Sequence, residues 1–171
     1  MRSASIHATA PPARWRFAAT CSARVVLPLA QPDSAEQALE IARTLSASGA
    51  VDLVVVDSAA ALVPKLEMSL GVGSAPGLHS RVMASGLQKL AQSLARSGAC
   101  VVFLNQMRNR ESGGETSAGG PPLKLHASVR ITLLKTGGQR VALCVVKNKV
   151  AIGAEGRELE WQRGGGFVES P

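Results

Sequence analysis

Short apolar runs alternate with amphipathic stretches along this chain, in an order that predicts an α/β fold. Residues 51–57 and 99–104 are apolar runs rich in β-branched residues, typical of strands that are buried in a parallel sheet. Each run follows a stretch with apolar residues at helical spacing, residues 33–48 and 78–97. Two consecutive helix–strand units imply right-handed crossovers and a parallel sheet flanked by helices.

The first of these helices has recognisable end signals. Asp33 to Glu36 resembles a capping box in which Asp33 takes the place of the usual serine or threonine. Gly49 is a plausible stop, because glycine adopts the left-handed conformation that often ends a helix. We therefore expect the helix to begin just after Asp33 and to end at Gly49.

The last third of the chain changes to short strands. Residues 129–134, 140–146 and 158–161 are strand-like and separated by turns that contain glycine, which predicts antiparallel hairpins. We therefore expect a mixed, largely parallel sheet. The Gly-rich stretches 69–77 and 107–124 are expected to be loops, and loops of this length are usually functional or mobile.

Length and charge restrict the picture further. The 171 residues suffice for one domain with a real core. Residues 1–23 are rich in Arg, Ala and Ser and contain no acid, so we expect a disordered or non-native segment and assign the fold to residues 24–171. Residues 1–32 supply +4 of the net charge of +7, so the remainder is weak support for a nucleic-acid partner.

The cysteines and the apolar runs point to a cytoplasmic location. Three cysteines without paired spacing argue against a disulfide framework and fit a reducing compartment. The longest apolar runs have the length of strands, so a membrane span is not expected. The sequence contains no Cys/His cluster with the ligand spacing of a zinc site.

Asp57 ends the first apolar run and Ser58 follows it directly. The carboxyl ends of parallel strands form the edge at which open α/β sheets bind their ligands. In nucleotide-hydrolysing domains an acid in this place helps to hold the Mg²⁺ that bridges the phosphates. Alternatively, Asp57 or Ser58 caps the short helix that follows. The strand by itself leaves both interpretations open.

Asn105 and Gln106 end the second apolar run, at the same predicted edge. An amide there could sense a phosphate or orient a water, and pass that state into the following loop. The alternative is an amide that binds the loop backbone. Lys147 and Lys149 lie on one side of a later strand, where they could hold a shared anion or be a solvated strand end.

The stretch 107–124 combines glycines with basic side chains. Backbone amides and cations of this kind can follow a phosphate backbone. The stretch contains no aromatic residue, so base stacking is not available from it. A solvated flexible loop explains the same composition. Its basic residues are Arg108, Arg110 and Lys124.

Taken in order, these residues resemble the bacterial RecA family, ATP-dependent recombinases that coat single-stranded DNA. The similarity covers roughly residues 31–167, and at least five uncommon strings occur with the spacing of the family. The matching landmarks are Gln31 to Asp33, Glu36 to Ile41, Ser48 to Asp52, Val54 to Ser58, Phe103 to Arg108, Gly119 and Gly120, Ala127 to Arg130, and Val145 to Val150.

The resemblance implies a RecA-like P-loop NTPase core that uses ATP and Mg²⁺. Asp57 would hold Mg²⁺ and, with Ser58 and Gln106, contact the nucleotide. Gln106 would contact the γ-phosphate and couple the nucleotide state to DNA binding. Lys147 and Lys149 would reach a neighbouring subunit's ATP, so that these two lysines and Gln106 are the expected catalytic residues.

The implied partners are single-stranded and double-stranded DNA and further copies of the chain in a filament, with no membrane. Residues 67–77 resemble the family's first DNA-binding loop, and residues 107–124 resemble the second. The residues expected at the DNA site are Arg81, Arg108, Arg110, Gly119, Gly120 and Lys124.

The chain also departs from the family pattern. No Gly-x-x-x-x-Gly-Lys-Ser/Thr phosphate loop precedes residue 31, and the strand that carries the catalytic glutamate is missing. Gln88 stands where an arginine is usual. We therefore expect poor or absent ATP affinity and leave hydrolysis open. The alternatives are a non-hydrolysing accessory protein of DNA repair, another ATPase on the same core such as a hexameric helicase, and an inactive gene fragment.

Overall fold

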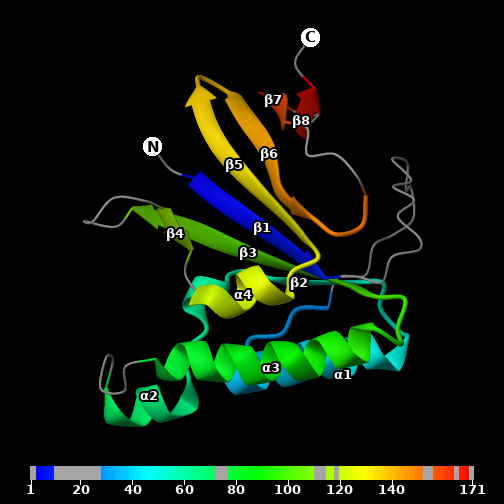
Figure 1. Ribbon diagram of the computed structural model, residues 1–171, viewed down its shortest axis with the longest axis vertical. Coiled ribbons are helices and arrows are strands. Elements are labelled where there is room, and N and C mark those ends of the chain that lie inside the picture. The colour runs from blue at the N-terminus through cyan, green and yellow to red at the C-terminus, as the bar shows by residue number, and fades with distance from the viewer. Residues whose placement is uncertain are drawn as a thin grey trace.

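The computed structural model describes residues 3–9, 28–71, 77–109, 115–117, 120–151, 156–163 and 166–169. These residues form one mixed sheet with helices packed against it (Figure 1). In chain order the elements are β1 (Ser3–Thr9), α1 (Ala35–Ser48), β2 (Leu53–Val56), the short 3₁₀ helix η1 (Ala59–Ala61), α2 (Lys65–Leu70), α3 (Leu78–Leu94), β3 (Cys100–Asn109), β4 (Glu115–Ser117), α4 (Gly120–His126), β5 (Val129–Gly137), β6 (Arg140–Asn148), β7 (Gly156–Gln162) and β8 (Gly166–Glu169).

The two long helices confirm the amphipathic pattern, with one correction at the first helix start. Ser34, not Asp33, is the N-cap of α1, and its hydroxyl accepts a hydrogen bond from Gln37 N at 3.3 Å. The Gln37 side chain accepts from Asp33 N at 2.6 Å, one residue before the N-cap, so the capping pair is Ser34 and Gln37 and not Asp33 and Glu36. Gly49 ends the helix at a φ of 69°, as its position in the sequence predicts.

The sheet is mixed but not largely parallel. Among the described strands only β2 and β3 pair in parallel, while every other pair is antiparallel. The strand order is β2-β3-β1-β5-β6-β7-β8, with β4 paired to β3 alone. The antiparallel hairpins expected in the last third are therefore present, but they join the same sheet and outnumber the parallel strands.

Strand β1 lies within residues 1–23, which were predicted to lie outside the fold. Residues 3–9 pair with β3 on one side and β5 on the other, both antiparallel. Two neighbouring strands that each offer free N–H and C=O groups can recruit a short polar segment through its backbone alone. The hydrophobic pattern did not reveal this strand, because the segment contains only one large apolar residue, Ile6.

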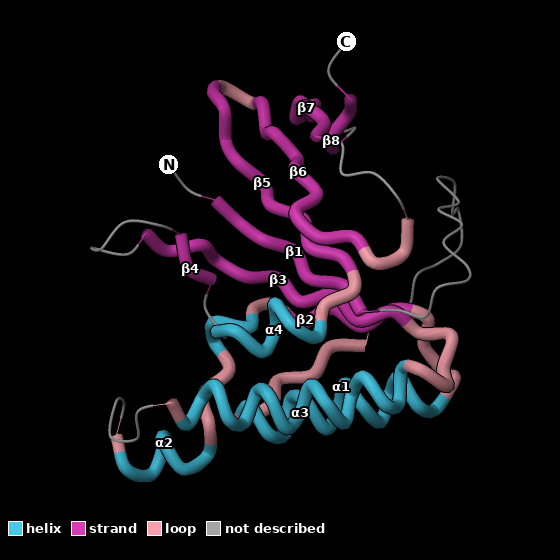
Figure 2. Tube along the Cα trace, viewed as in Figure 1, coloured by secondary structure: helices cyan, strands magenta, loops and turns pink. Residues whose placement is uncertain are grey.

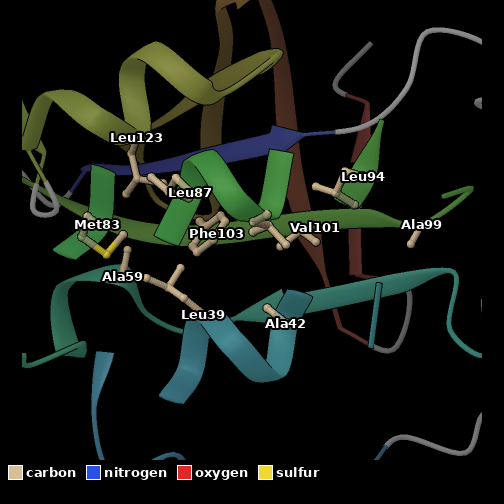
Figure 3. Close-up of a cluster of buried hydrophobic side chains, with 11 residues drawn as sticks. Leu39, Ala42, Ala59, Met83, Leu87, Leu94, Ala99, Val101, Phe103 and Leu123 are labelled. Atoms are coloured by element: carbon tan, nitrogen blue, oxygen red, sulfur yellow. The ribbon is translucent and has the colours of Figure 1, made fainter. Parts of the chain in front are cut away.

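The core lies between the sheet and its helical layer, and α1 to α4 all lie on one side of the sheet (Figure 2). Phe103 and Val101 of β3 point into this layer and are almost fully buried (Figure 3). They meet side chains from α1, α3 and α4. The cluster comprises Leu39, Ala42, Ala59, Met83, Leu87, Leu90, Leu94, Ala99, Val101, Phe103 and Leu123.

The opposite face of β2 is uncovered in the described part of the chain. Val54 and Val56 pack against the core, whereas Leu53 and Val55 on the other face are 55% and 52% exposed. A strand buried on both faces, which the apolar run predicted, is thus buried on one face only. None of the described helices has the length and apolar composition needed to cross a lipid bilayer.

Candidate functional site

Asp57 lies directly after β2, at the carboxyl edge of the parallel strand pair. Its side chain is exposed, and among the described residues none forms a hydrogen bond or ion pair with the carboxylate. Ser58 is the N-cap of η1 but its side chain makes no capping hydrogen bond. Ser58 thus occupies the cap position that was the alternative, without a side-chain capping bond, and the Asp57 carboxylate is available for a cation or water.

Gln106 lies at the same edge but further along its strand than expected. Strand β3 does not end at Gln106 and continues to Asn109. Val56 pairs with Phe103, so Gln106 is three residues, or about 10 Å, beyond the last rung of β2. The Gln106 side chain is exposed, whereas Asn105 is 3% exposed and its Oδ1 accepts from Gln106 N at 2.9 Å. The exposed amide thus projects where β3 extends past its parallel neighbour.

The two stretches predicted as loops contain regular structure. Strands β3 and β4 pair in the second stretch, with Arg108 opposite Thr116, and α4 begins at Gly120. Helix α2 ends at Leu70 and so includes only the first two residues of the first stretch, 69–77. Neither α2 nor α4 was predicted, because a helix of seven residues or fewer leaves almost no periodic signal.

The residues expected at the DNA site occupy several elements. Arg81 lies in the first turn of α3 with an exposed side chain, and Lys124 is a half-buried residue of α4. Helix α4 packs on α3, and its Leu123 joins the core cluster. The backbones of Arg108 and Gly120 lie in β3 and α4, while Arg110 and Gly119 lie outside the described residues.

A second group of charges surrounds Lys147 near the end of β6. Lys147 Nζ donates to the carbonyl oxygens of Lys124 at 2.6 Å and Leu125 at 3.1 Å, both in the last turn of α4. A lysine in this position satisfies carbonyls that a helix end leaves unpaired. The lysine that the resemblance directs toward a neighbour's nucleotide thus binds a helix of its own chain.

Arg130 completes this group and was not among the expected site residues. It pairs with Lys147 across β5 and β6, and its Nε is buried without a hydrogen-bond partner among the described residues. Lys149 lies two residues beyond Lys147 with an exposed side chain, and no described acid forms an ion pair with any of the three. We call Arg130, Lys147 and Lys149 the basic cluster. Its chemistry suits an anion with several oxygens.

The environment of Lys147 predicts a pH dependence of stability. Burial, followed by the charges of Lys149 and Arg130, lowers the pKa of the Lys147 ammonium from its ordinary value of 10.5. Between the folded pKa and 10.5 the unfolded chain therefore binds more protons, so the free energy of unfolding rises with pH in this window. We expect Lys147→Gln to flatten this rise and Lys135→Gln, at an exposed lysine of β5, to leave it intact.

Urea unfolding midpoints measured from about pH 8 to about pH 10.5 test this expectation. Burial raises the pKa of the Cys100 thiol above its ordinary value of 9.0. Its contribution is therefore lost as the pH rises, opposite in sign to that of Lys147. Cys100 is present in all three proteins, so the difference between the variants isolates Lys147. Equal slopes for the two variants would show that Lys147 is not the titrating group.

Asp57 and the basic cluster lie far apart within one chain. One row of paired residues crosses five strands, from Val56 through Phe103, His7 and Arg130 to Lys147. Four strand spacings of about 4.8 Å separate Val56 from Lys147, a distance of about 19 Å. Asp57 follows Val56, so a single chain does not bring its carboxylate and the basic cluster together around one small ligand.

The residues at Asp57 fit a loosely held Mg²⁺ better than a metal cage built by the protein. The described residues contain no group of three or more His, Cys, Asp or Glu that could hold a metal. Mg²⁺ is commonly held by one or two carboxylates together with waters and the phosphates of a nucleotide. An exposed carboxylate without a partner meets this requirement only when a nucleotide supplies further oxygens.

Comparison with known proteins finds that this chain matches one family over most of its length. The model of the RecA N-terminal domain matches residues 21–167. Protein RecA 1 of Myxococcus xanthus is 43% identical over 153 residues, which cover 81% of this chain and 45% of that protein. Protein RecA of Caulobacter vibrioides (strain NA1000 / CB15N) is 47% identical over 137 residues, which cover 72% of this chain and 38% of that protein.

Protein RecA of Citrifermentans bemidjiense is 48% identical over 137 residues, covering 72% of this chain and 40% of that protein. The chain thus spans less than half the length of each of these three relatives. The family match begins at residue 21, ten residues before the first landmark string at Gln31.

Proposed function

Because the chain belongs to the RecA family, we propose that it is part of a RecA-type P-loop NTPase core that binds single-stranded DNA and Mg-ATP in homologous recombination and DNA repair. In this proposal the nucleotide site is shared between neighbouring chains. One chain contributes the Asp57 edge and the next contributes the basic cluster.

The observation that carries this proposal is the distance of about 19 Å between Val56 and Lys147 along one row of the sheet. Each half carries one sign of charge, a free carboxylate at one end and the basic cluster at the other. Neither half has a compensating partner among the described residues. A head-to-tail contact between copies brings unlike halves together at every junction, which is the interface type that builds open filaments.

At the Asp57 edge the chain's own groups would bind and orient the metal ion and the nucleotide phosphates. Mg²⁺ held there would supply positive charge that offsets the charge developing on the phosphates. Asp57 would hold the ion through its carboxylate, with Ser58 beside it, and Gln106 would offer an amide to a terminal phosphate. At the other half, Lys149 and Arg130 would donate hydrogen bonds to phosphate oxygens, and Lys147 would divide its donors between those oxygens and α4.

The DNA-binding surface in this proposal follows α3 and α4. Arg81 and Lys124 supply charges that contact phosphates, and strands β3 and β4 present Arg108 on the segment between Gln106 and α4. Lys147 bonds to α4, and Gln106 precedes the β3–β4 segment, so both halves of the nucleotide site connect to this surface. Nucleotide binding would order the β3–β4 segment, and this ordering would couple nucleotide binding to DNA binding.

A second candidate function is a non-hydrolysing accessory protein that joins a recombinase filament. The bonds from Lys147 Nζ to the carbonyl oxygens of Lys124 and Leu125 favour this function, because they occupy one of the cations expected to contact a nucleotide. It predicts binding of single-stranded DNA that depends on salt but is unchanged by Mg-ATP.

Mixing two half-site variants tests the shared site. Asp57→Asn removes the carboxylate half and Lys149→Gln weakens the basic half, while Lys147 keeps its bonds to α4. In the unmodified chain, millimolar Mg-ATP is expected to increase the affinity for a labelled oligonucleotide. We expect each variant alone to lose this increase. In a 1:1 mixture assembled at random, about a quarter of the junctions join two intact halves, so part of the increase returns.

The control mixture combines Asp57→Asn with the double variant Asp57→Asn/Lys149→Gln, in which no junction has two intact halves. Two results would contradict a site shared between chains. In one, Mg-ATP increases the affinity of the control mixture as much as that of the first mixture. In the other, Mg-ATP leaves the affinity of the first mixture unchanged, as it does for each variant alone. Fluorescence anisotropy of the oligonucleotide gives the readout in every case.

A further inference from the structure

A groove runs between α1 and α3 and has no role in the site described above. The two helices approach closely at Gly86, where a Cβ atom would lie 2.4 Å from Leu39 Cδ1. Longer side chains rise on both sides of this contact and leave two hollows, of about 450 and 170 Å³, that share Glu40, Arg43 and Lys89 among their lining residues. Figure 1 shows the two helices at the end of the molecule furthest from the β5–β6 hairpin.

The character of the groove changes along its length. The half nearer the amino ends of the helices is lined by Leu39, Val82 and Gly86, and its charged lining residues are Glu36, Glu40, Arg43 and Lys89. The floor is therefore apolar, and both carboxylates of the groove lie at this end. This half offers a place for one apolar side chain.

The other half is basic and polar. Three cations, Arg43, Lys89 and Arg96, face one carboxylate, and Gln92 and Ser93 add hydrogen-bonding groups. Arg43 Nε donates to Glu40 Oε2 at 2.9 Å, so these two charges offset each other, and the interaction lowers the pKa of the Glu40 carboxyl. Lys89 and Arg96 are exposed and form no ion pair with a described acid.

We propose that this groove, defined by Leu39 and Val82 at one end and Lys89 and Arg96 at the other, docks an acidic segment of a partner protein. An apolar side chain of that segment lies over Leu39 and Val82, and its carboxylates lie beside Lys89 and Arg96. From Val82 to Leu94, the last residue of α3, the helix rises about 18 Å, which corresponds to about five residues of extended peptide.

Charge complementarity favours a peptide over a nucleic acid. A phosphodiester backbone carries charge at every step, so its passage along the groove would set phosphates against Glu36 and Glu40. No aromatic side chain lines either hollow, so stacking of bases does not compensate for that repulsion. A peptide with one apolar residue followed by acids matches both halves.

The test uses the full 171-residue chain and a fluorescein-labelled peptide of eight residues, Gly-Leu-Ser-Glu-Glu-Ser-Glu-Glu. We expect saturable binding by anisotropy at low ionic strength, and an affinity at least 10-fold lower for Lys89→Glu/Arg96→Glu. The control Lys135→Glu/Arg163→Glu makes the same change in net charge at exposed residues of β5 and the turn after β7, and is expected to bind as the unmodified chain does.

Two comparison ligands make the result specific. A peptide with glutamine in place of each glutamate is expected to bind at least 10-fold more weakly, and an oligothymidylate of eight nucleotides is expected not to displace the acidic peptide. Far-UV circular dichroism and unfolding midpoints check that the variants remain folded. Equal peptide binding by both double variants, or displacement by the oligonucleotide at equal concentration, would overturn the proposal.

Discussion

Replacing Phe103 with alanine is expected to destabilise the folded chain by about 3–5 kcal/mol. The ring is 1% exposed and lies at the centre of the cluster that joins β3 to the helices (Figure 3). Its removal leaves a cavity between layers that the surrounding leucines can fill only in part. Because a domain of this size is stable by only about 5–15 kcal/mol, such a loss is a large fraction of the total.

Val146→Ala is the matched control, because Val146 lies in β6 and is 48% exposed. We expect this change to cost less than about 1 kcal/mol. Urea unfolding followed by circular dichroism measures both differences. A cost for Phe103→Ala as small as that of the control would contradict the position of the core between β3 and the helical layer.

The combination of Arg81→Glu and Lys124→Glu is expected to weaken binding of single-stranded DNA at least about 10-fold, because two phosphate contacts become repulsive. The salt dependence should change with the affinity. For single strands each lost phosphate contact reduces the slope of log affinity against log salt by about 0.7, so we expect a reduction of about 1.4. Anisotropy titrations of a labelled oligonucleotide at several salt concentrations give both quantities.

A control of equal charge distinguishes a local contact from a general loss of positive charge. Lys135→Glu/Arg163→Glu alters the net charge equally but lies on the antiparallel part of the sheet. The single variant Arg81→Glu is also measured, because glutamate in place of the half-buried Lys124 could disturb α4. Equal weakening by the control, or no weakening by Arg81→Glu, would remove α3 and α4 from the DNA-binding surface.

The sequence predicted the helix–strand units well because hydrophobic burial determines them. The apolar spacing behind Asp33 and Gly49 at its end predicted α1 to within one or two residues. The same reasoning predicted α3, which begins at Leu78 as expected and ends at Leu94, three residues before the end of the predicted stretch. Asp57 and Gln106 were placed at one edge because strands β2 and β3 are parallel, and that pairing is confirmed.

The sequence did not predict features that depend on backbone pairing or on distant contacts. β4 has only three residues, and β1 alternates apolar and polar residues but contains just one large apolar side chain, Ile6, so neither gives a strong strand signal. Both pair with neighbouring strands through their backbone groups. Arg130 was overlooked as a site residue because its partner, Lys147, is distant in sequence and adjacent only through the β5–β6 pairing. The bonds from Lys147 to α4 likewise depend on tertiary structure.

The most direct test of the proposed function is a titration of a labelled single-stranded oligonucleotide with the 171-residue chain, with and without Mg-ATP, over a range of salt concentrations. We predict binding that weakens as salt rises and that tightens in millimolar Mg-ATP. Binding that is indifferent to Mg-ATP would favour the accessory protein. No binding by a folded, soluble chain would contradict the proposal that this part of the RecA fold binds DNA.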